Sequence, residues 1–281
     1  MPVRAPEKLE VAGLAVTVWP GDGPTVLGLP GLGSSGHAWA PLAASLPEAH
    51  LVAPDLRGRG RSKHRTGEPG LLGHAKDVRA VAEELDLRDV VVVGHSMGAY
   101  LAPLVARELG DRVARLVLVD GGIRPGFPFF MTPRVVRMTF RRQLSGADQE
   151  YPDVEAFAKK GRVGPMLASR PDLLPTVMQM LEAELDGPPG RLRPQLDVAR
   201  ATDDAVDAFF GPEVLSALEQ LTAPTQVLLA ESTKKDGQRP FISDKAVAPW
   251  LATKPNLTVT RLPGNHLTVL FAPEVAAAVG S

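Results

Sequence analysis

The sequence predicts an α/β protein in which a mostly parallel central sheet is flanked by helices and carries an inserted helical cap. Short apolar runs that end in Gly, Pro or Asp alternate with segments of helical periodicity, which is typical of strands buried on both faces. From residue 121 to 212 this alternation stops, and helix-like segments broken by Pro and Gly follow one another. The strand pattern then returns, so we expect both ends of the chain to build one sheet.

The N-terminal part of the sheet is expected to begin with an antiparallel hairpin. Residues 9–11 and 14–19 are β-rich and are separated by Ala12 and Gly13, which form a short turn. Four compact apolar runs predict the centre of the sheet, at residues 25–29, 50–53, 90–93 and 116–119. Helical spacing of apolar residues predicts the helices between them, at residues 75–85 and 99–109.

The C-terminal part returns to alternating strands and helices. Runs at residues 225–230 and 257–262 predict two further strands, and residues 244–251 and 273–279 predict two helices. Residues 1–120 and 213–281 are therefore expected to form the core domain, with residues 121–212 as the cap.

The predicted cap is rich in phenylalanine. Seven of the nine Phe residues of the chain lie in it, namely Phe127, Phe129, Phe130, Phe140, Phe157, Phe209 and Phe210. They either line a pocket or fill a small core of the cap. We expect Phe127, Phe129 and Phe209 to line the substrate pocket, which favours an apolar substrate.

Composition excludes several classes of function. The chain has 31 basic and 32 acidic residues, so it has no positive surplus for binding nucleic acid. It contains no Cys, which excludes disulfides, thiolate metal sites and a cysteine nucleophile. Neither a signal peptide nor a run of about 18 apolar residues occurs. We expect a cytoplasmic protein that acts on a small molecule away from membranes, and a homodimer is compatible with these features.

The strongest chemical signal is a Gly-x-Ser-x-Gly motif placed between a strand and a helix. Four valines, residues 90–93, lead into Gly94, Ser96 and Gly98, and a helical pattern follows. A sharp strand-to-helix turn strains the central residue, so its neighbours two positions away have to be Gly. This context indicates that Ser96 is a nucleophile whose oxygen stands clear of the sheet.

With this motif, the chain resembles the α/β-hydrolase family over nearly its whole length. Residues 29–35 (Leu-Pro-Gly-Leu-Gly-Ser-Ser) are similar to the family's oxyanion loop, although Pro30 stands where many members carry His. The resemblance implies that the amides of Leu32 and Met97 form the oxyanion hole, and that no cofactor or metal is needed. Residues 53–62 resemble the loop after the family's fourth strand, and we interpret their Arg cluster as structural.

The proton acceptor for Ser96 is predicted from chain order. Of the six His residues, only His266 lies C-terminal to the Ser, since His95 precedes it directly and is expected to point away. His266 follows the last strand, where the family keeps its base.

The acid of the triad has two candidates. Asp120 ends the run at residues 116–119, and some relatives take their acid from this position. Asp236 lies in the loop after residue 230, where most members carry the acid, but it comes late in that loop and follows two Lys residues. We favour Asp120 and keep Asp236 as the alternative.

These residues predict a serine hydrolase of a carboxylic ester or lactone, acting through an acyl-enzyme. Hydrolysis of a C–C bond and cofactor-free perhydrolysis use the same triad in this family and remain alternatives. Halide displacement and epoxide opening are disfavoured, because the related enzymes use Asp where this chain has Ser96. A ligand receptor with weak or no catalysis is the alternative outside enzymes.

Overall fold

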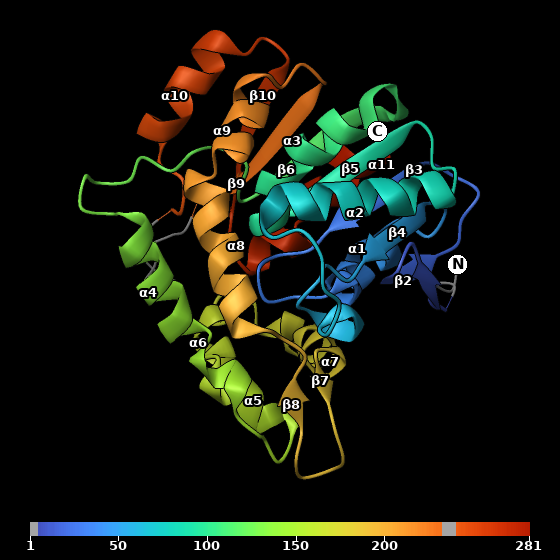
Figure 1. Ribbon diagram of the computed structural model, residues 1–281, viewed down its shortest axis with the longest axis vertical. Helices are drawn as coiled ribbons and strands as arrows, with labels where there is room; N and C mark the ends of the chain where they lie inside the picture. The colour runs from blue at the N-terminus through green and yellow to red at the C-terminus, as the bar shows by residue number, and fades with distance from the viewer. Residues whose placement is uncertain (1–4, 232–239) are drawn as a thin grey trace.

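The computed structural model describes residues 5–231 and 240–281 and shows an α/β fold with one eight-stranded sheet (Figure 1). The strand order is β1-β2-β4-β3-β5-β6-β9-β10. The strands are β1 (Glu7–Val11), β2 (Leu14–Trp19), β3 (Thr25–Leu29), β4 (His50–Pro54), β5 (Val90–His95), β6 (Val113–Val119), β9 (Thr225–Ala230) and β10 (Leu257–Leu262).

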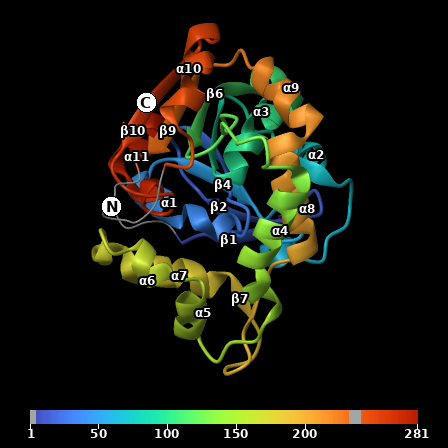
Figure 2. The same ribbon diagram turned by 90° about the vertical axis from the view of Figure 1, so that its left-hand side faces the viewer.

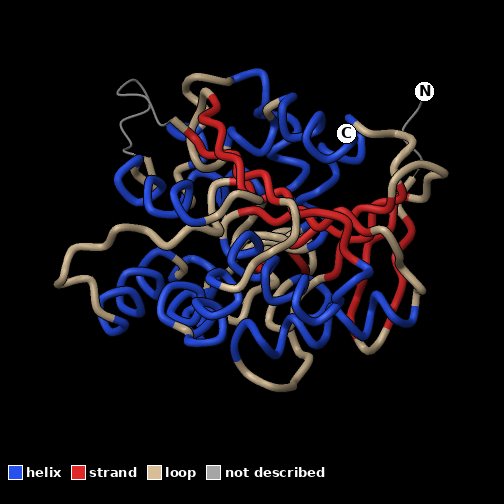
Figure 3. The backbone as a smooth tube through the Cα atoms, turned by 90° about the horizontal axis from the view of Figure 1, so that it is seen from above, coloured by secondary structure: helices blue, strands red, loops and turns tan. Residues whose placement is uncertain are grey.

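Most of the sheet is parallel, as the sequence predicts. Only the pairs β1–β2 and β2–β4 are antiparallel, and the other pairs run in the same direction. Seen from above, the strands form a twisted layer with helices on both sides (Figure 3). The hairpin expected at the N-terminus is confirmed, with Val11 paired to Leu14.

The two faces of the sheet are covered by different helices. In β5, Val90 and Val92 belong to one buried cluster, which includes residues of α2 and α3, whereas Val91 and Val93 belong to another, which includes residues of α1 and α11. Burial on both faces explains why the strand reads as an unbroken apolar run. The helices of the core are α1 (Ala40–Ser45), α2 (Gly70–Glu84), α3 (Met97–Leu109), α10 (Asp244–Thr253) and α11 (Pro273–Gly280).

The chain between β6 and β9 forms a largely helical module. Most of it lies to the left of and below the sheet in Figure 1 and below the sheet in Figure 2, whereas its last helix lies beside α3. Part of it has a small apolar cluster of its own, consisting of Ala158, Val163, Leu167, Leu173 and Val177. The helices of this segment are α4 (Pro133–Gln143), α5 (Val154–Lys160), α6 (Val163–Met166), α7 (Leu174–Ala183), α8 (Val198–Phe210) and α9 (Pro212–Glu219).

The sequence shows no convincing strand between residues 121 and 212, but the structure has two short ones there. Leu185–Asp186 (β7) and Arg193–Pro194 (β8) pair as a short antiparallel ribbon. Two residues per strand are too few to show the alternation from which strands are predicted. Short 3₁₀ helices complete the structure: η1 (Gly36–Trp39), η2 (Gly60–Ser62), η3 (Gly110–Arg112), η4 (Ser145–Asp148), η5 (Pro171–Leu173) and η7 (Thr268–Phe271).

Helix α2 begins five residues before the predicted start. The Leu71 amide donates to Oδ2 of Asp207 at 2.7 Å, so a side chain of α8 accepts one of the helix's free N–H groups. A partner 136 residues away leaves no local signal in the sequence. Over the two described ranges of the chain, no helix has the length and apolar character needed to cross a membrane.

Candidate active site

Ser96 sits at a strained turn between β5 and α3. Its backbone has φ 54° and ψ −116°, which is unusual for a residue other than Gly. A Cβ on Gly94 would lie 2.3 Å from the carbonyl oxygen of Gly98, and a Cβ on Gly98 would lie 2.1 Å from that of Leu29. Both glycines of the motif are therefore required by contact, as the sequence predicts.

Three side chains from separate strand ends form one hydrogen-bonded chain. His266, in the loop after β10, has its Nε2 2.9 Å from Oγ of Ser96. Its Nδ1 lies 2.6 Å from Oδ2 of Asp120, the residue that follows β6. Because a carboxylate only accepts, Nδ1 carries the proton and Nε2 is left to accept from the Ser hydroxyl.

Asp120 is buried, with 1% of its surface exposed, and its second oxygen is also satisfied. Oδ1 accepts from the Ala230 amide at 3.0 Å. Burial alone would raise the pKa of the Asp120 carboxyl, but the hydrogen bond and charge of His266 and the Ala230 amide hold it below its ordinary value. The other candidate acid, Asp236, lies outside the described residues.

The loop that carries His266 is held by hydrogen bonds within the loop and by one from His95. Oδ1 of Asn265 accepts from the amides of Leu267 and Thr268 at 3.0 and 3.1 Å. His95 also contacts this loop, because its Nε2 donates to the carbonyl oxygen of His266 at 2.9 Å. Burial, followed by the nearby charge of His266, lowers the pKa of His95 to about 4, so His95 is neutral at pH 7.

The predicted oxyanion loop lies directly against Ser96. A Cβ on Gly31 would meet Cβ of Ser96 at 3.6 Å. Within residues 5–231 and 240–281, the amides of Leu32 and Met97 donate no hydrogen bond to the protein. Two unpaired N–H groups beside a serine oxygen can receive the negative oxygen of a tetrahedral intermediate.

A cavity of about 410 Å³ opens over Ser96. Apart from polar groups at the reacting centre and Gln143, its walls are mostly apolar. The lining residues are Gly31, Leu32, Gly33, Ser34, His95, Ser96, Met97, Tyr100, Phe140, Gln143, Leu144, Ala205, Ala208, Phe209, Phe241 and His266.

Comparison of the chain with known protein families gives a match over most of its length. The model of the alpha/beta hydrolase family matches residues 26–279. The chain belongs to the alpha/beta hydrolase family. The resemblance and the fold class expected from the sequence are thereby confirmed.

Individual relatives of this α/β-hydrolase are more distant. An uncharacterized protein of Mycobacterium tuberculosis is 33% identical over 103 residues, which is 36% of this chain and 30% of that protein. The match thus spans about a third of that relative's length. The 2-(acetamidomethylene)succinate hydrolase of Mesorhizobium japonicum is 26% identical over 260 residues, which cover 91% of this chain and 86% of the relative.

Solved structures agree in fold. A crystal structure of E-2-(acetamidomethylene)succinate hydrolase has a TM-score of 0.75 at 23% identity and covers 98% of this chain and 97% of its own. A thermophilic esterase from Thermogutta terrifontis has a TM-score of 0.69 at 22% identity, over 98% and 96% of the two chains. At these identities the likeness establishes the fold alone.

Of the three Phe residues predicted to line the pocket of this α/β-hydrolase, one lies in the wall of this cavity. Phe209 lines the cavity, but Phe127 stands behind it, with its ring centre 5.2 Å from that of Phe209. Phe129 is 97% exposed. The Met131 amide bonds the carbonyl oxygen of Pro128, and this tight turn carries Phe129 at its tip into solvent.

The cavity also has wall residues other than the three predicted for the pocket, and one of them, Phe140, belongs to the Phe-rich set of the predicted cap. Phe140 and Leu144 line it together with Gln143, at the spacing of one face of α4, and that periodicity could have revealed them. Phe241 lies in an irregular segment before α10, and no local pattern marks it.

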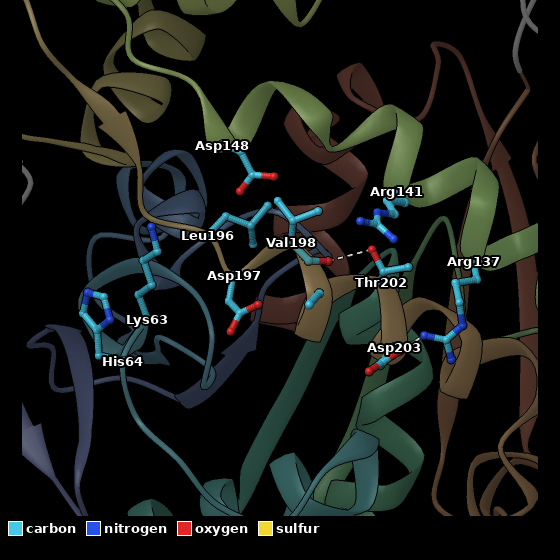
Figure 4. A pocket seen from close by; sticks show the side chains of 11 residues that line it. Lys63, His64, Arg137, Arg141, Asp148, Leu196, Asp197, Val198, Thr202 and Asp203 are labelled. Carbon is cyan, nitrogen blue, oxygen red and sulfur yellow. Dashed lines mark hydrogen bonds and ion pairs between the residues drawn. The ribbon is translucent and has the colours of Figure 1, made fainter.

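A second cavity, of about 500 Å³, lies between α4 and the N-terminal end of α8 (Figure 4). Its walls carry charges of both signs, and Arg137 is paired with Asp203. Thr202 Oγ1 donates to the carbonyl oxygen of Val198. Its lining holds no serine or cysteine, so we place the chemistry at Ser96.

The residues at Ser96 offer a nucleophile and a proton carrier from their side chains. Among the residues that the structure describes, no group of three or more His, Cys, Asp or Glu side chains could hold a metal ion.

Proposed function

We propose that this α/β-hydrolase is a serine hydrolase that cleaves a carboxylic ester or lactone of a small apolar substrate. One observation carries the proposal: the hydrogen-bonded chain Ser96–His266–Asp120 ends at a mostly apolar cavity. Leu32 and Met97, whose amides are unpaired among the described residues, also line this cavity. The base His266 is within hydrogen-bonding distance of the nucleophile on one side and of the orienting acid on the other, which is the arrangement that acyl transfer requires.

In the first half-reaction, Oγ of Ser96 attacks the substrate carbonyl carbon while Nε2 of His266 takes the hydroxyl proton. The carbonyl oxygen becomes an oxyanion and accepts from the amides of Leu32 and Met97. Asp120 stabilises the imidazolium that results. The intermediate then collapses, His266 returns its proton to the leaving alkoxide, and an ester bond to Ser96 remains.

In the second half-reaction, water repeats these steps. His266 takes a proton from the water, whose oxygen attacks the acyl carbon, and the proton then passes to Oγ of Ser96. A carboxylic acid is released and the resting enzyme is restored. With a lactone, the alcohol and the acid leave as one hydroxy acid.

An apolar, uncharged substrate is supported by the lining of the cavity. Phe140, Phe209 and Phe241 contribute aromatic surface, and no Lys or Arg occurs among the described residues that line it. A succinate derivative, as in the name of the Mesorhizobium japonicum relative, carries carboxylates that call for a cation in the pocket. We therefore favour neutral esters or lactones over dicarboxylates.

A substrate panel tests the proposal. Purified protein and Ser96→Ala are assayed with p-nitrophenyl esters of increasing acyl length, with aliphatic lactones, with a vinylogous diketone and with acetate plus hydrogen peroxide. We expect Ser96-dependent release of acid from esters or lactones. Turnover of the diketone or formation of peracid, with no ester or lactone cleavage, would assign the triad to C–C hydrolysis or perhydrolysis instead.

A further inference from the structure

A buried arginine touches both residues of the proposed oxyanion hole. Arg59, in the loop after β4, is 1% exposed. Its Nε donates to the carbonyl oxygen of Leu32 at 2.8 Å, and its Nη2 lies 3.4 Å from Sδ of Met97. The catalytic steps above do not use Arg59, yet a single guanidinium contacts each residue whose amide is to meet the oxyanion.

Helix α8 holds this guanidinium from the other side. Arg59 Nη2 donates to Oδ2 of Asp204 at 2.7 Å, and Nε2 of His74 lies 3.0 Å from the same oxygen. Burial alone would raise the pKa of Asp204, but the charge of Arg59 and the hydrogen bond of His74 lower it to about 2. Asp204 is therefore ionised at neutral pH and forms a buried ion pair with Arg59.

The backbone around Arg59 is also bonded to the segment that precedes α8. The Gly60 amide donates to the carbonyl oxygen of Gln195 at 2.8 Å, and the Asp197 amide donates to that of Gly58 at 2.7 Å. The two backbone hydrogen bonds involve the residues on either side of Arg59 in the sequence. Together with the ion pair to Asp204, they fix Arg59 relative to the module inserted between β6 and β9.

The far end of the oxyanion loop is tied to the same module. Oε1 of Glu184, at the end of α7, accepts from the amide and the hydroxyl of Ser35 at 2.8 and 2.9 Å. The Gln195 amide in turn donates to the backbone carbonyl oxygen of Glu184 at 2.8 Å. The inserted module therefore contacts the loop from Gly31 to Ser35 at its middle, through Arg59, and at its end.

We propose that Arg59 is a positioning residue of the oxyanion hole and that Asp204 holds it in place. The proposal rests on the proposed acyl-transfer function. The Leu32 carbonyl belongs to the peptide unit that follows the Leu32 α-carbon. Anchoring it restricts the preceding peptide unit, which carries the Leu32 N–H, to rotation about the two backbone bonds of Leu32. An oxyanion donor acts in the transition state, where losing one costs roughly 10² to 10³ in turnover, so a misdirected donor should lower kcat rather than substrate binding.

A neighbouring arginine offers a matched control. Arg57 lies in the same loop, is 2% exposed and pairs with Asp77 at 2.5 Å. Its Nη2 donates to the carbonyl oxygen of Glu68 at 2.6 Å. No contact joins its side chain to Leu32 or Met97 within the described residues. A loss that merely reflects a disturbed buried ion pair should therefore appear equally in Arg57→Lys.

Two variants separate positioning from folding. Arg59→Lys keeps the charge but cannot hold Leu32 and Asp204 together with one planar group. Arg59→Met/Asp204→Leu removes both charges, because removing a single partner would leave the other buried and unpaired. Circular dichroism and thermal melting establish that each variant folds before its kinetics are measured with a p-nitrophenyl ester.

We expect kcat to fall about 10- to 100-fold in both variants, with KM within about threefold of wild type. The inhibition constant of an aryl trifluoromethyl ketone, which adds to Ser96 Oγ as a tetrahedral oxyanion, should rise by the same factor as kcat falls. If Arg59 only stabilised the fold, the fall in kcat and the rise in the inhibition constant would not match. Arg57→Lys should change each quantity by less than about threefold.

Folded Arg59 variants with kcat and ketone affinity no worse than those of Arg57→Lys would overturn the proposal. Failure of both variants to fold would assign the pair to stability and overturn it as well. These results differ from failure of the proposed function, which would appear in the wild type as absent ester and lactone cleavage and no labelling of Ser96 by a fluorophosphonate. That result would reject both proposals.

Discussion

Two strained residues face each other in the proposed catalytic centre. Ser96 has φ 54° and Asp120 has φ 44°, and neither is Gly. A left-handed backbone of this kind costs roughly 1 to 3 kcal/mol per residue, and it persists where surrounding contacts determine it. The two turns are packed together, since a Cβ on Gly121 would lie 2.4 Å from the carbonyl oxygen of Ser96. The packing of the turn after β6 against the turn at Ser96 thus helps to hold the strained backbone of both turns.

At the residue scale, Ser96 and His266 are predicted to act as one unit. Ser96→Ala should lower kcat for the best ester by roughly 10⁴- to 10⁶-fold, and His266→Ala should be nearly as severe. The double variant should be hardly worse than either single one, because each change already removes the activated nucleophile. Steady-state assays with matched enzyme concentrations provide the measurement. Losses that multiply in the double variant would show that the two residues act independently.

Asp120→Asn should reduce kcat by about 10⁴-fold, because an amide in place of the carboxylate favours the wrong tautomer of His266. Asp236→Asn is the matched control and should keep most of the activity. The same ester assay measures both. If the large loss falls on Asp236→Asn while Asp120→Asn stays active, Asp236 is the acid and Asp120 supports the strand end.

At the element scale, α4 and α8 form much of the wall of the cavity. Phe140 of α4 and Phe209 of α8 line it, with ring centres 6.1 Å apart. The side chains between these helices therefore control the shape of the pocket, whereas the reacting groups come from strand ends. Substitutions in α4 or α8 can therefore change which substrates fit the pocket without altering the catalytic residues.

Phe140→Ser should raise KM for long-chain and ring-bearing esters more than KM for the acetate ester, because only the larger acyl groups reach the aromatic wall. The effect should be about 10-fold, the scale of one buried apolar group in a pocket. Phe129→Ser is the control, since Phe129 is 97% exposed and should leave both constants unchanged. Equal changes for acetate and for larger esters would mean that Phe140 does not select the substrate.

The site residues could be predicted where neighbouring residues in the sequence determine the local backbone or where chain order leaves one candidate. The turn at Ser96 needs Gly94 and Gly98, and a run of four valines marks the strand before it, so the nine residues from Val90 to Gly98 are enough to predict the nucleophile. His266 followed from chain order. The preference for Asp120 agrees with its contact to His266, although the sequence alone left two acids open.

Long-range contacts could not be predicted. Arg59 reads as one of several arginines in a loop, and its partner Asp204 lies 145 residues away. Glu184 looks like a surface residue at a helix end, yet it is buried against Ser35. Charged side chains are mostly exposed in proteins, so pattern alone assigns such residues to solvent.

At the scale of the whole molecule, the burial of Glu184 makes stability depend on pH. Burial raises the pKa of Glu184 to about 7, with Asp55 acting in the same direction and the Ser35 hydrogen bonds and Arg59 opposing it. In the unfolded chain the pKa is about 4.3. Between these values the folded protein holds a proton that the unfolded chain has lost. The stability that Glu184 contributes is therefore full below about pH 4.3 and lost as pH rises through about 7.

The free energy of unfolding of the wild type should accordingly fall relative to that of Glu184→Gln between pH 5 and pH 8. Urea unfolding at both pH values measures the difference. Glu182→Gln, at an exposed position two residues earlier, is the control and should follow the wild type at both pH values. A difference between wild type and Glu184→Gln that is the same at pH 5 and pH 8 would show that Glu184 does not titrate in this range.

If Ser96 is an activated nucleophile, a fluorophosphonate should modify it, and intact-protein mass spectrometry after incubation with the reagent measures this. The serine oxygen displaces fluoride from phosphorus, so an activated serine gains one phosphonyl group and the mass of the protein increases accordingly. We expect a single adduct, located on the peptide that contains Ser96, and none in Ser96→Ala or His266→Ala. An unlabelled wild type, or an adduct that persists in Ser96→Ala, would contradict this expectation.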